Sequence, residues 1–208
     1  MDAPALLGFE PLFASPLLRF ALPDAAALNA MLVAEARAMR AAGPGMSVSN
    51  QHGWHSAMDL FHRSEPGCAA LCRHILAALR SATLRVSPGF DFSTKALQVE
   101  GWININSQGS YNTPHSHAGW AWSGTYYAAV PENAPGRSGL LEFLDPRAGI
   151  SVISVEGAGC FATKMQVQPK PGEMVIFPAY LTHWVYPNEL AGERVSVAFN
   201  ARFAPRPR

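Results

Sequence analysis

The change to a two-residue period near position 96 is the feature that most restricts how this chain can fold. In the segment 97–106 the odd positions are apolar, whereas the even positions are polar or aromatic. Such alternation is typical of a β-strand with two different faces. Because a polar face on a central strand needs water or a ligand to satisfy it, the even positions indicate a site. These positions are Gln98, Glu100, Trp102, Asn104 and Asn106.

Further short strand-like segments follow, each separated from the next by a turn rich in Pro, Gly or Asp. Many short strands with regular turn signals are typical of a sandwich or a jelly roll. We therefore expect a mainly β, cupin-like jelly roll in the second half of the chain. The expected strands cover 96–106, 120–129, 139–144, 150–155, 160–168, 173–177 and 193–203.

The first half of the chain predicts helices. A first strand over 9–20 contains two prolines and so suits a sheet edge. One helix is expected to begin with Asp24 as its N-cap and a second with Ser64, and both carry apolar residues at helical spacing. We expect these helices to pack on one face of the sheet. Residues 1–208 are then one domain, with 1–95 as a strand plus helical support region and 96–203 as the jelly-roll core.

Composition excludes several classes of partner. The 208 residues carry a net charge of +1, so no basic field is available for nucleic acid. No apolar run approaches the roughly 20 residues of a membrane span, and no basic segment precedes an apolar one at the N-terminus. We expect a cytoplasmic protein. The three cysteines do not predict a disulfide framework, and Cys68 and Cys72 share a helix face where buried thiols are expected.

Three histidines form the candidate metal site. His115 and His117 are two residues apart in an extended segment, so their side chains are expected on one side of a strand. His183 lies far along the chain, and a jelly roll can bring such distant strands face to face. Three ligands on one face of an octahedron leave the opposite face open for substrates and O₂. Any single histidine would more often be a hydrogen-bonded surface or core residue, but the three together favour a metal.

Arg194 is the second candidate, because it lies within an otherwise apolar strand. A buried arginine needs an anionic partner, which is either a protein carboxylate or a ligand. A guanidinium binds a carboxylate with two parallel hydrogen bonds, and Ser196 has the same strand parity. An iron enzyme that uses 2-oxoglutarate needs such an anchor for the distal carboxylate of that dianion.

Several stretches together resemble one family. From about 101 to 200 the chain is similar to the double-stranded β-helix of iron(II)/2-oxoglutarate-dependent oxygenases of the prolyl-hydroxylase-like kind, and the whole chain resembles a bacterial group of such oxygenases. The resemblance implies that His115 and His183 bind Fe(II) and that Arg194 with Ser196 holds 2-oxoglutarate, which Tyr127 also contacts. The implied reaction couples oxidative decarboxylation of 2-oxoglutarate, with O₂, to hydroxylation of an unknown substrate. The matching stretches are 49–50, 53–56, 102–117, 123–127, 143–147, 178–183 and 194–200.

The chain departs from the family pattern at His117. The usual motif is His-x-Asp, whereas this chain has His-x-His. His117 then replaces a carboxylate ligand, which changes the charge of the site. In the alternative interpretation, His117 lies behind the ligands and Asp145 or Glu142 supplies the carboxylate.

Two other functions remain open on the same fold. The stretch 172–178 with His183 resembles the second cupin motif, and a three-histidine cupin-type dioxygenase would not need 2-oxoglutarate. The glutamate expected after the first histidine pair is missing, because position 121 is Ala. A non-catalytic metal-binding jelly roll is the third hypothesis. The Arg194–Ser196 pair favours the oxygenase.

The remaining candidates carry weaker signals. Asn104 is expected to face the cosubstrate from the polar side of its strand. Trp54, His55 and Trp120 are candidates for the substrate mouth, although aromatic residues more often pack in a core. A small molecule or a peptide is the expected substrate, and the sequence specifies neither its identity nor whether the chain forms a homodimer.

Overall fold

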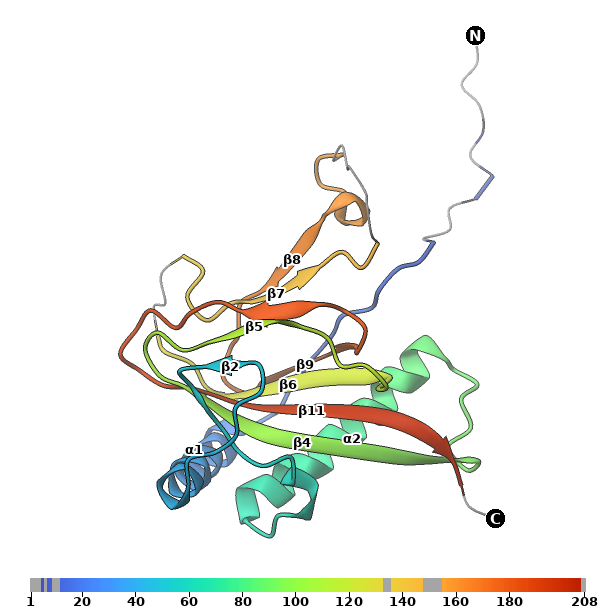
Figure 1. Ribbon diagram of the computed structural model, residues 1–208. Helices are drawn as coiled ribbons and strands as arrows, with labels where there is room; N and C mark the ends of the chain where they lie inside the picture. The colour runs from blue at the N-terminus through green and yellow to red at the C-terminus, as the bar shows by residue number, and fades with distance from the viewer. Residues whose placement is uncertain (1–4, 6, 9–11, 133–135, 148–154, 207–208) are drawn as a thin grey trace.

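Two antiparallel sheets face each other, and two helices cover the outer face of the larger one (Figure 1). The computed structural model describes residues 5, 7–8, 12–132, 136–147 and 155–206. The larger sheet has the order β1 (Leu18–Ala21), β9 (Glu173–Pro178), β6 (Trp122–Ala129), β11 (Arg194–Pro205), β4 (Lys95–Asn106) and β3 (Trp54–His55). The smaller sheet has the order β2 (Asn50–Gln51), β5 (Tyr111–His115), β10 (His183–Val185), β7 (Leu141–Leu144) and β8 (Lys164–Val167). This architecture confirms the double-stranded β-helix with two N-terminal helices on one sheet.

The helices α1 (Ala25–Ala42) and α2 (Pro66–Val86) bury one face of the larger sheet. Their apolar residues, such as Leu32 and Leu79, join the odd-numbered residues of β11 in one core cluster. The two-residue period therefore separates the strand faces as expected. The even-numbered residues of β4 and β11 point instead toward the smaller sheet, where they line a cavity.

A second, smaller core fills part of the space between the sheets. Val175 and Phe177 of β9 contribute to it from the larger sheet, and Leu141 and Phe143 of β7 contribute from the smaller one. Phe177 and Phe143 meet edge to face with ring centroids 4.7 Å apart. This packing holds the two sheets together on one side of the cavity.

The helix caps differ from the expectation. Asp24 is the N-cap residue of α1, as expected, but it has a φ of 50° and makes no side-chain capping hydrogen bond. The residue before α2 is Glu65 rather than Ser64, and it also makes no such bond. The first amides of α2 instead donate to the carboxylate of Glu35 on α1, from Gly67 at 2.7 Å and Cys68 at 2.9 Å. Sequence rules failed here because the cap comes from the neighbouring helix.

The strand expectations need three corrections, and a fourth expected strand is not tested. The first strand is short: within 12–20 only residues from Leu18 onward are in β1, which does lie at the sheet edge. The segment 46–60, expected as a loop, contributes the short strands β2 and β3. The segment 160–168 begins in a 3₁₀ turn, η2 (Gly159–Phe161), before β8 starts; a second such turn is η1 (Leu60–His62). Most of the expected strand 150–155 lies outside the described residues.

The expected burial of the two helix thiols holds for Cys68, whereas Cys72 is only partly buried. Cys72 donates its thiol to the carbonyl of Leu60. Burial raises the pKa of Cys72 to about 11. No helix among the described residues is both long enough and apolar enough to cross a membrane.

Gly124 gives a test of the packing beneath the cavity. A Cβ at this position would lie less than 3.0 Å from the ring of Phe199 and from the carbonyl oxygen of Val175. We expect Gly124→Ala to lower the free energy of unfolding by about 1–3 kcal/mol, because neither the ring nor the strand can move freely. Urea unfolding measures this change. Gly89→Ala is the control, since nothing lies within 4 Å of its added methyl group, and an equal loss in both variants would contradict the prediction.

Candidate metal centre

Strand pairing brings two of the three histidines together. His183 in β10 pairs directly with His115 in β5, and the centroids of their rings are 4.4 Å apart. Each ring lies at an end of its strand, His115 as the last residue of β5 and His183 as the first of β10. Two segments about 70 residues apart in sequence are thus joined at one corner of the smaller sheet.

His117 joins them from the irregular segment just after β5 rather than from a strand. β5 ends at His115, so only the first of the two histidines lies on the strand, although both rings face the same site as expected. The chain is held instead by the backbone amide of His117, which donates to the carbonyl of Ala179 at 2.9 Å. Its ring centroid lies 5.0 Å from that of His115 and 5.2 Å from that of His183. One ligand atom from each ring lies within 4.8 Å of the other two, so a single ion could contact all three.

Two of the rings are fixed in the form that a metal requires. The Nδ1 atom of His115 is 2.7 Å from the carbonyl oxygen of Thr113, and that of His183 is 2.8 Å from that of Leu181. A carbonyl can only accept, so each Nδ1 carries the proton and donates it. The lone pair is then on Nε2, which is free to bind an ion.

Burial keeps the three imidazoles neutral. It lowers the pKa of His183 to about 3, with the neighbouring His115 adding to the effect. Burial and His115 together lower the pKa of His117 to about 4. Burial also lowers the pKa of His115. Neutral imidazole is the form that coordinates metals, so protons do not compete for these ligands near neutral pH.

These shifts predict how the stability of the metal-free protein depends on pH. An unfolded histidine binds a proton near pH 6.5, whereas folded His183 does so only near pH 3. Between these values the unfolded chain binds more protons, so the free energy of unfolding falls as the pH is lowered. We expect His183→Asn to lose less of this free energy than the original chain between pH 6.5 and 4, as measured by urea unfolding. Identical pH slopes for the two proteins would contradict the prediction.

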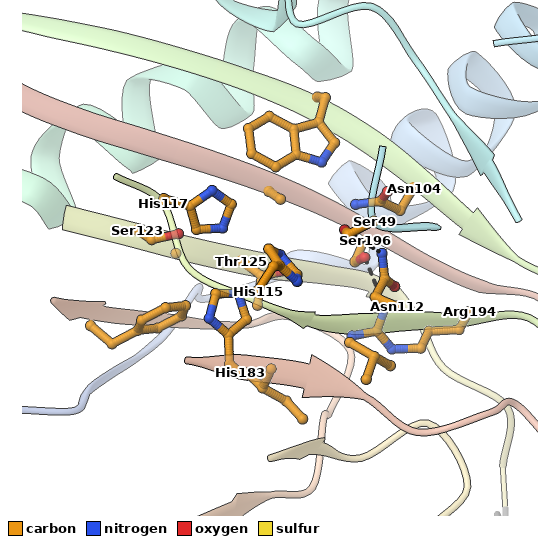
Figure 2. Close-up of a pocket in the computed structure, with 16 residues that line it drawn as sticks. Ser49, Asn104, Asn112, His115, His117, Ser123, Thr125, His183, Arg194 and Ser196 are labelled. Carbon is orange, nitrogen blue, oxygen red and sulfur yellow. Dashed lines mark hydrogen bonds between the residues drawn. The ribbon is translucent and has the colours of Figure 1, made fainter. Parts of the chain in front are cut away.

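A cavity of about 50 Å³ connects the histidines with Arg194. Figure 2 shows the three imidazoles gathered toward one end, with Arg194 and Ser196 toward the other. This volume is large enough for several water molecules and therefore suits a small polar ligand. Its lining comes from both sheets and from the segment before β2: Ser49, Trp102, Asn104, Asn112, His115, His117, Ser123, Gly124, Thr125, Leu141, Phe177, His183, Val185, Arg194, Ser196 and Ala198.

Arg194 is buried without a protein anion. Arg194 is 2% exposed, and its Nη1 donates to the hydroxyl of Ser196 at 3.0 Å. Its guanidinium carbon lies 5.1 Å from the ring centroid of Tyr127. Its Nε has no hydrogen-bond partner, and no ion pair joins it to a carboxylate among the described residues. The salt-bridge alternative is therefore not observed in the described part of the chain, and the burial lowers the pKa of Arg194.

Other polar atoms near this end also lack partners. The hydroxyl of Tyr127 is fully buried without a hydrogen bond, and burial raises the pKa of this tyrosine. Asn104, which lines the cavity, has an unpaired buried Oδ1, and so does Asn106 beside it. Buried polar atoms are costly when unpaired, so this set indicates a ligand rather than a packed core.

The carboxylate alternatives are occupied elsewhere. Glu142 is 1% exposed, but its oxygens accept from Gln166, Tyr186 and Lys164. Asp145 forms an ion pair with Arg147 at 2.6 Å. Among the described residues, the group that could hold a metal around His115 contains no Asp or Glu. The interpretation in which Glu142 or Asp145 replaces His117 as a ligand is therefore not supported.

The aromatic candidates for the substrate mouth do not line the cavity. The indole of Trp54 donates to the carbonyl of Gly43 at 3.0 Å and packs against the core beneath the helices. His55 stacks on Trp102, which does line the cavity, with ring centroids 5.3 Å apart. The guanidinium carbon of Arg202 lies over Trp120, 4.9 Å from the ring centroid of that tryptophan. Their contact with a substrate stays a prediction.

Several lining residues were missed by sequence reasoning. Ser123 and Thr125 follow from the parity of Tyr127 on β6, so the alternation could have found them. Trp102 lies on the polar face of β4 that the sequence marked as a site. Ser49 and Asn112 had no such signal, because Ser49 precedes the two-residue strand β2, and the position of β2 beside Asn112 of β5 is defined only by pairing across the smaller sheet.

The fold and this cavity define a metal-binding protein of the double-stranded β-helix class. Three neutral imidazoles with an open side suit iron, and they also suit other divalent first-row ions. Residues 100–200, which include all three histidines and Arg194, match the family described as "Putative 2OG-Fe(II) oxygenase". This part of the chain is therefore similar to that family of 2OG-Fe(II) oxygenases.

Solved structures support the same fold. The chain is similar to a prolyl-4-hydroxylase of Pseudomonas putida, with 20% identity, a TM-score of 0.60, and coverage of 92% of this chain and 94% of that one. It is similar to HygX of Streptomyces hygroscopicus, solved with nickel, 2-oxoglutarate and hygromycin B, with 15% identity, a TM-score of 0.61, and coverage of 90% and 82%. It is also similar to the α-ketoglutarate-dependent epimerase SnoN from nogalamycin biosynthesis, with 16% identity, a TM-score of 0.63, and coverage of 93% and 79%. No curated protein matches the sequence.

Proposed function

We propose that this protein is an iron(II)/2-oxoglutarate-dependent dioxygenase that hydroxylates a small-molecule or peptide substrate. The observation that carries the proposal is the buried guanidinium of Arg194, which has no carboxylate partner among the described residues and lies in the same cavity as three converging imidazoles. A dianion with one end at the metal and the other at Arg194 would satisfy both. The reaction is the one that the description of the family matched by residues 100–200 suggests.

His115, His117 and His183 would hold the iron. Their neutral rings leave the charge of the metal uncompensated, so iron(II) with three imidazoles carries +2. A 2-oxoglutarate dianion brings this to zero, which favours binding of the cosubstrate more strongly than a site that already contains an aspartate. The bound iron and 2-oxoglutarate together would supply activation of O₂ coupled to oxidative decarboxylation of the oxo acid.

The other residues orient the cosubstrate and exclude water. Arg194 would donate two parallel hydrogen bonds to the distal carboxylate, and the hydroxyl of Ser196 would add a third. Ser196 already accepts from Nη1 of Arg194, so it fixes the guanidinium in place. Tyr127 and Asn104 offer unpaired polar atoms at the same end. Phe177 and Trp102 provide an apolar wall that limits water near the metal.

Loss of the Arg194 guanidinium should weaken the binding of 2-oxoglutarate. We expect Arg194→Ala to weaken 2-oxoglutarate binding by about 30-fold or more, which corresponds to the roughly 2 kcal/mol or more lost when one partner of a buried charge pair is removed. Calorimetric titration of the metal-loaded protein measures this affinity. Arg206→Ala is the control, because Arg206 is an exposed arginine just after β11. Equal affinities in both variants would overturn the role of Arg194.

Turnover tests the reaction itself. With iron(II), ascorbate and 2-oxoglutarate, we expect slow production of succinate even without the unknown substrate, and we expect His183→Ala to abolish it because a metal ligand is lost. Chromatography of the products measures succinate directly. Succinate formed equally by His183→Ala, or absent while the wild-type protein binds both iron and 2-oxoglutarate, would count against the proposal.

The three-histidine set favours one rival function. A cupin-type dioxygenase would use the same ligands to oxidise its substrate with O₂ and without 2-oxoglutarate. Uptake of O₂ that depends on the metal but not on 2-oxoglutarate, and that survives Arg194→Ala, would select this rival. The buried, unpaired Nε of Arg194 is not explained by it.

A further inference from the structure

His117 differs from the other two histidines in what its Nδ1 atom contacts. His115 and His183 each donate this nitrogen's proton to a backbone carbonyl. The Nδ1 of His117 instead lies 3.3 Å from the side-chain nitrogen of Asn200. The ring of His117, which stands where the family has an aspartate, is therefore held by a side chain and not by a nearby backbone carbonyl.

Asn200 is itself fixed by a carboxylate. It lies in β11 with 1% exposure, and its Nδ2 donates to Oε1 of Glu100 at 2.9 Å. Glu100 stands directly opposite it on β4. The other atom of the amide, Oδ1, is buried with no hydrogen-bond partner. One amide group thus connects an acidic side chain to a candidate metal ligand.

Building on the proposed function, we propose that Asn200 is the positioning residue for His117 and that Glu100 opposes metal binding by fixing the orientation of the Asn200 amide. A partner on the outer nitrogen of a ligating imidazole fixes both the ring and its tautomer. Within the described residues, the Asn200 amide is the only side chain that hydrogen-bonds to the His117 ring.

The orientation of the amide determines where the His117 proton lies. A carboxylate only accepts, so Glu100 keeps Nδ2 of Asn200 turned toward itself. The same NH₂ group has a second hydrogen for Nδ1 of His117, which must then accept. The proton of the neutral ring is consequently on Nε2, opposite to the arrangement in His115 and His183.

Coordination through Nε2 requires the reverse arrangement. The proton must then be on Nδ1, where it needs an acceptor. Oδ1 of Asn200, now without a partner, becomes that acceptor if the amide turns over. The turn would bring an oxygen against the carboxylate of Glu100, which is repulsive. Glu100 therefore disfavours the ligand form of His117, and a residue able to donate at position 100 would favour it.

Cobalt(II) titration of the purified, full-length protein tests this. We expect Asn200→Ala to bind cobalt(II) about 10-fold more weakly, within the roughly 10- to 100-fold range for losing an outer partner of a ligand. We expect Glu100→Gln to bind cobalt(II) more tightly, because the glutamine amide can donate to Oδ1 of Asn200 after the Asn200 amide has turned over. The visible d–d bands of cobalt(II) should change shape in Asn200→Ala, since the third imidazole is no longer held.

Two further variants guard against loss of folding. Gln98→Ala is the matched control: it removes a cross-strand hydrogen bond to Arg202 at 2.8 Å, two residues along the same strand pair, without touching a histidine. We expect it to bind cobalt(II) as the wild type does. Asn200→Asp combined with Glu100→Gln gives His117 a permanent acceptor and should bind at least as tightly as the wild type.

The outcomes separate this inference from the proposed function. If His183→Ala binds cobalt(II) as tightly as the wild type, the metal site itself is wrong. If His183→Ala loses the ion but Asn200→Ala keeps it with unchanged d–d bands, only the role of Asn200 is overturned. If Glu100→Gln binds more weakly than the wild type, the carboxylate acts through its charge, and its assigned opposition to metal binding is overturned.

Discussion

The antiparallel pairing of β10 with β5 is the constraint on which the site depends, because it sets His183 opposite His115. Both strands are short, and neither would hold a fixed register alone. They are held because β7 pairs with the other edge of β10 and because Phe143 and Phe177 pack against the ring of His183. The metal-binding geometry is therefore a product of the small core between the sheets.

The larger sheet contributes the other half of the chemistry through one strand. The even-numbered residues of β11 place Arg194 and Ser196 at one end of the cavity and Asn200 behind His117 at the other. The odd-numbered residues of the same strand bind the sheet to the helices. One strand, β11, thus packs against the helices on one face and positions Arg194 and His117 on the other. The stability of the helical layer is therefore linked to the geometry of the site.

Much of this arrangement could be predicted from residue patterns, and the failures have physical causes. The alternation in β4 and β11 identified the polar face, and the three histidines with Arg194 were found from spacing and burial. The position of His117 beyond the end of β5 could not be found, because it depends on a backbone hydrogen bond to Ala179. The capping of α2 by Glu35 was equally hidden, since it joins residues 32 and 33 positions apart that meet only after the helices pack.

A centre made of three imidazoles with no carboxylate among the described residues has little means of choosing its metal. Nitrogen ligands of this kind follow the Irving–Williams order, in which copper(II) and zinc bind more tightly than iron(II). The fold presents the same three nitrogens to every ion. The occupant is consequently decided by which ions are abundant where the protein folds, and purified material will carry whatever metal its host supplied.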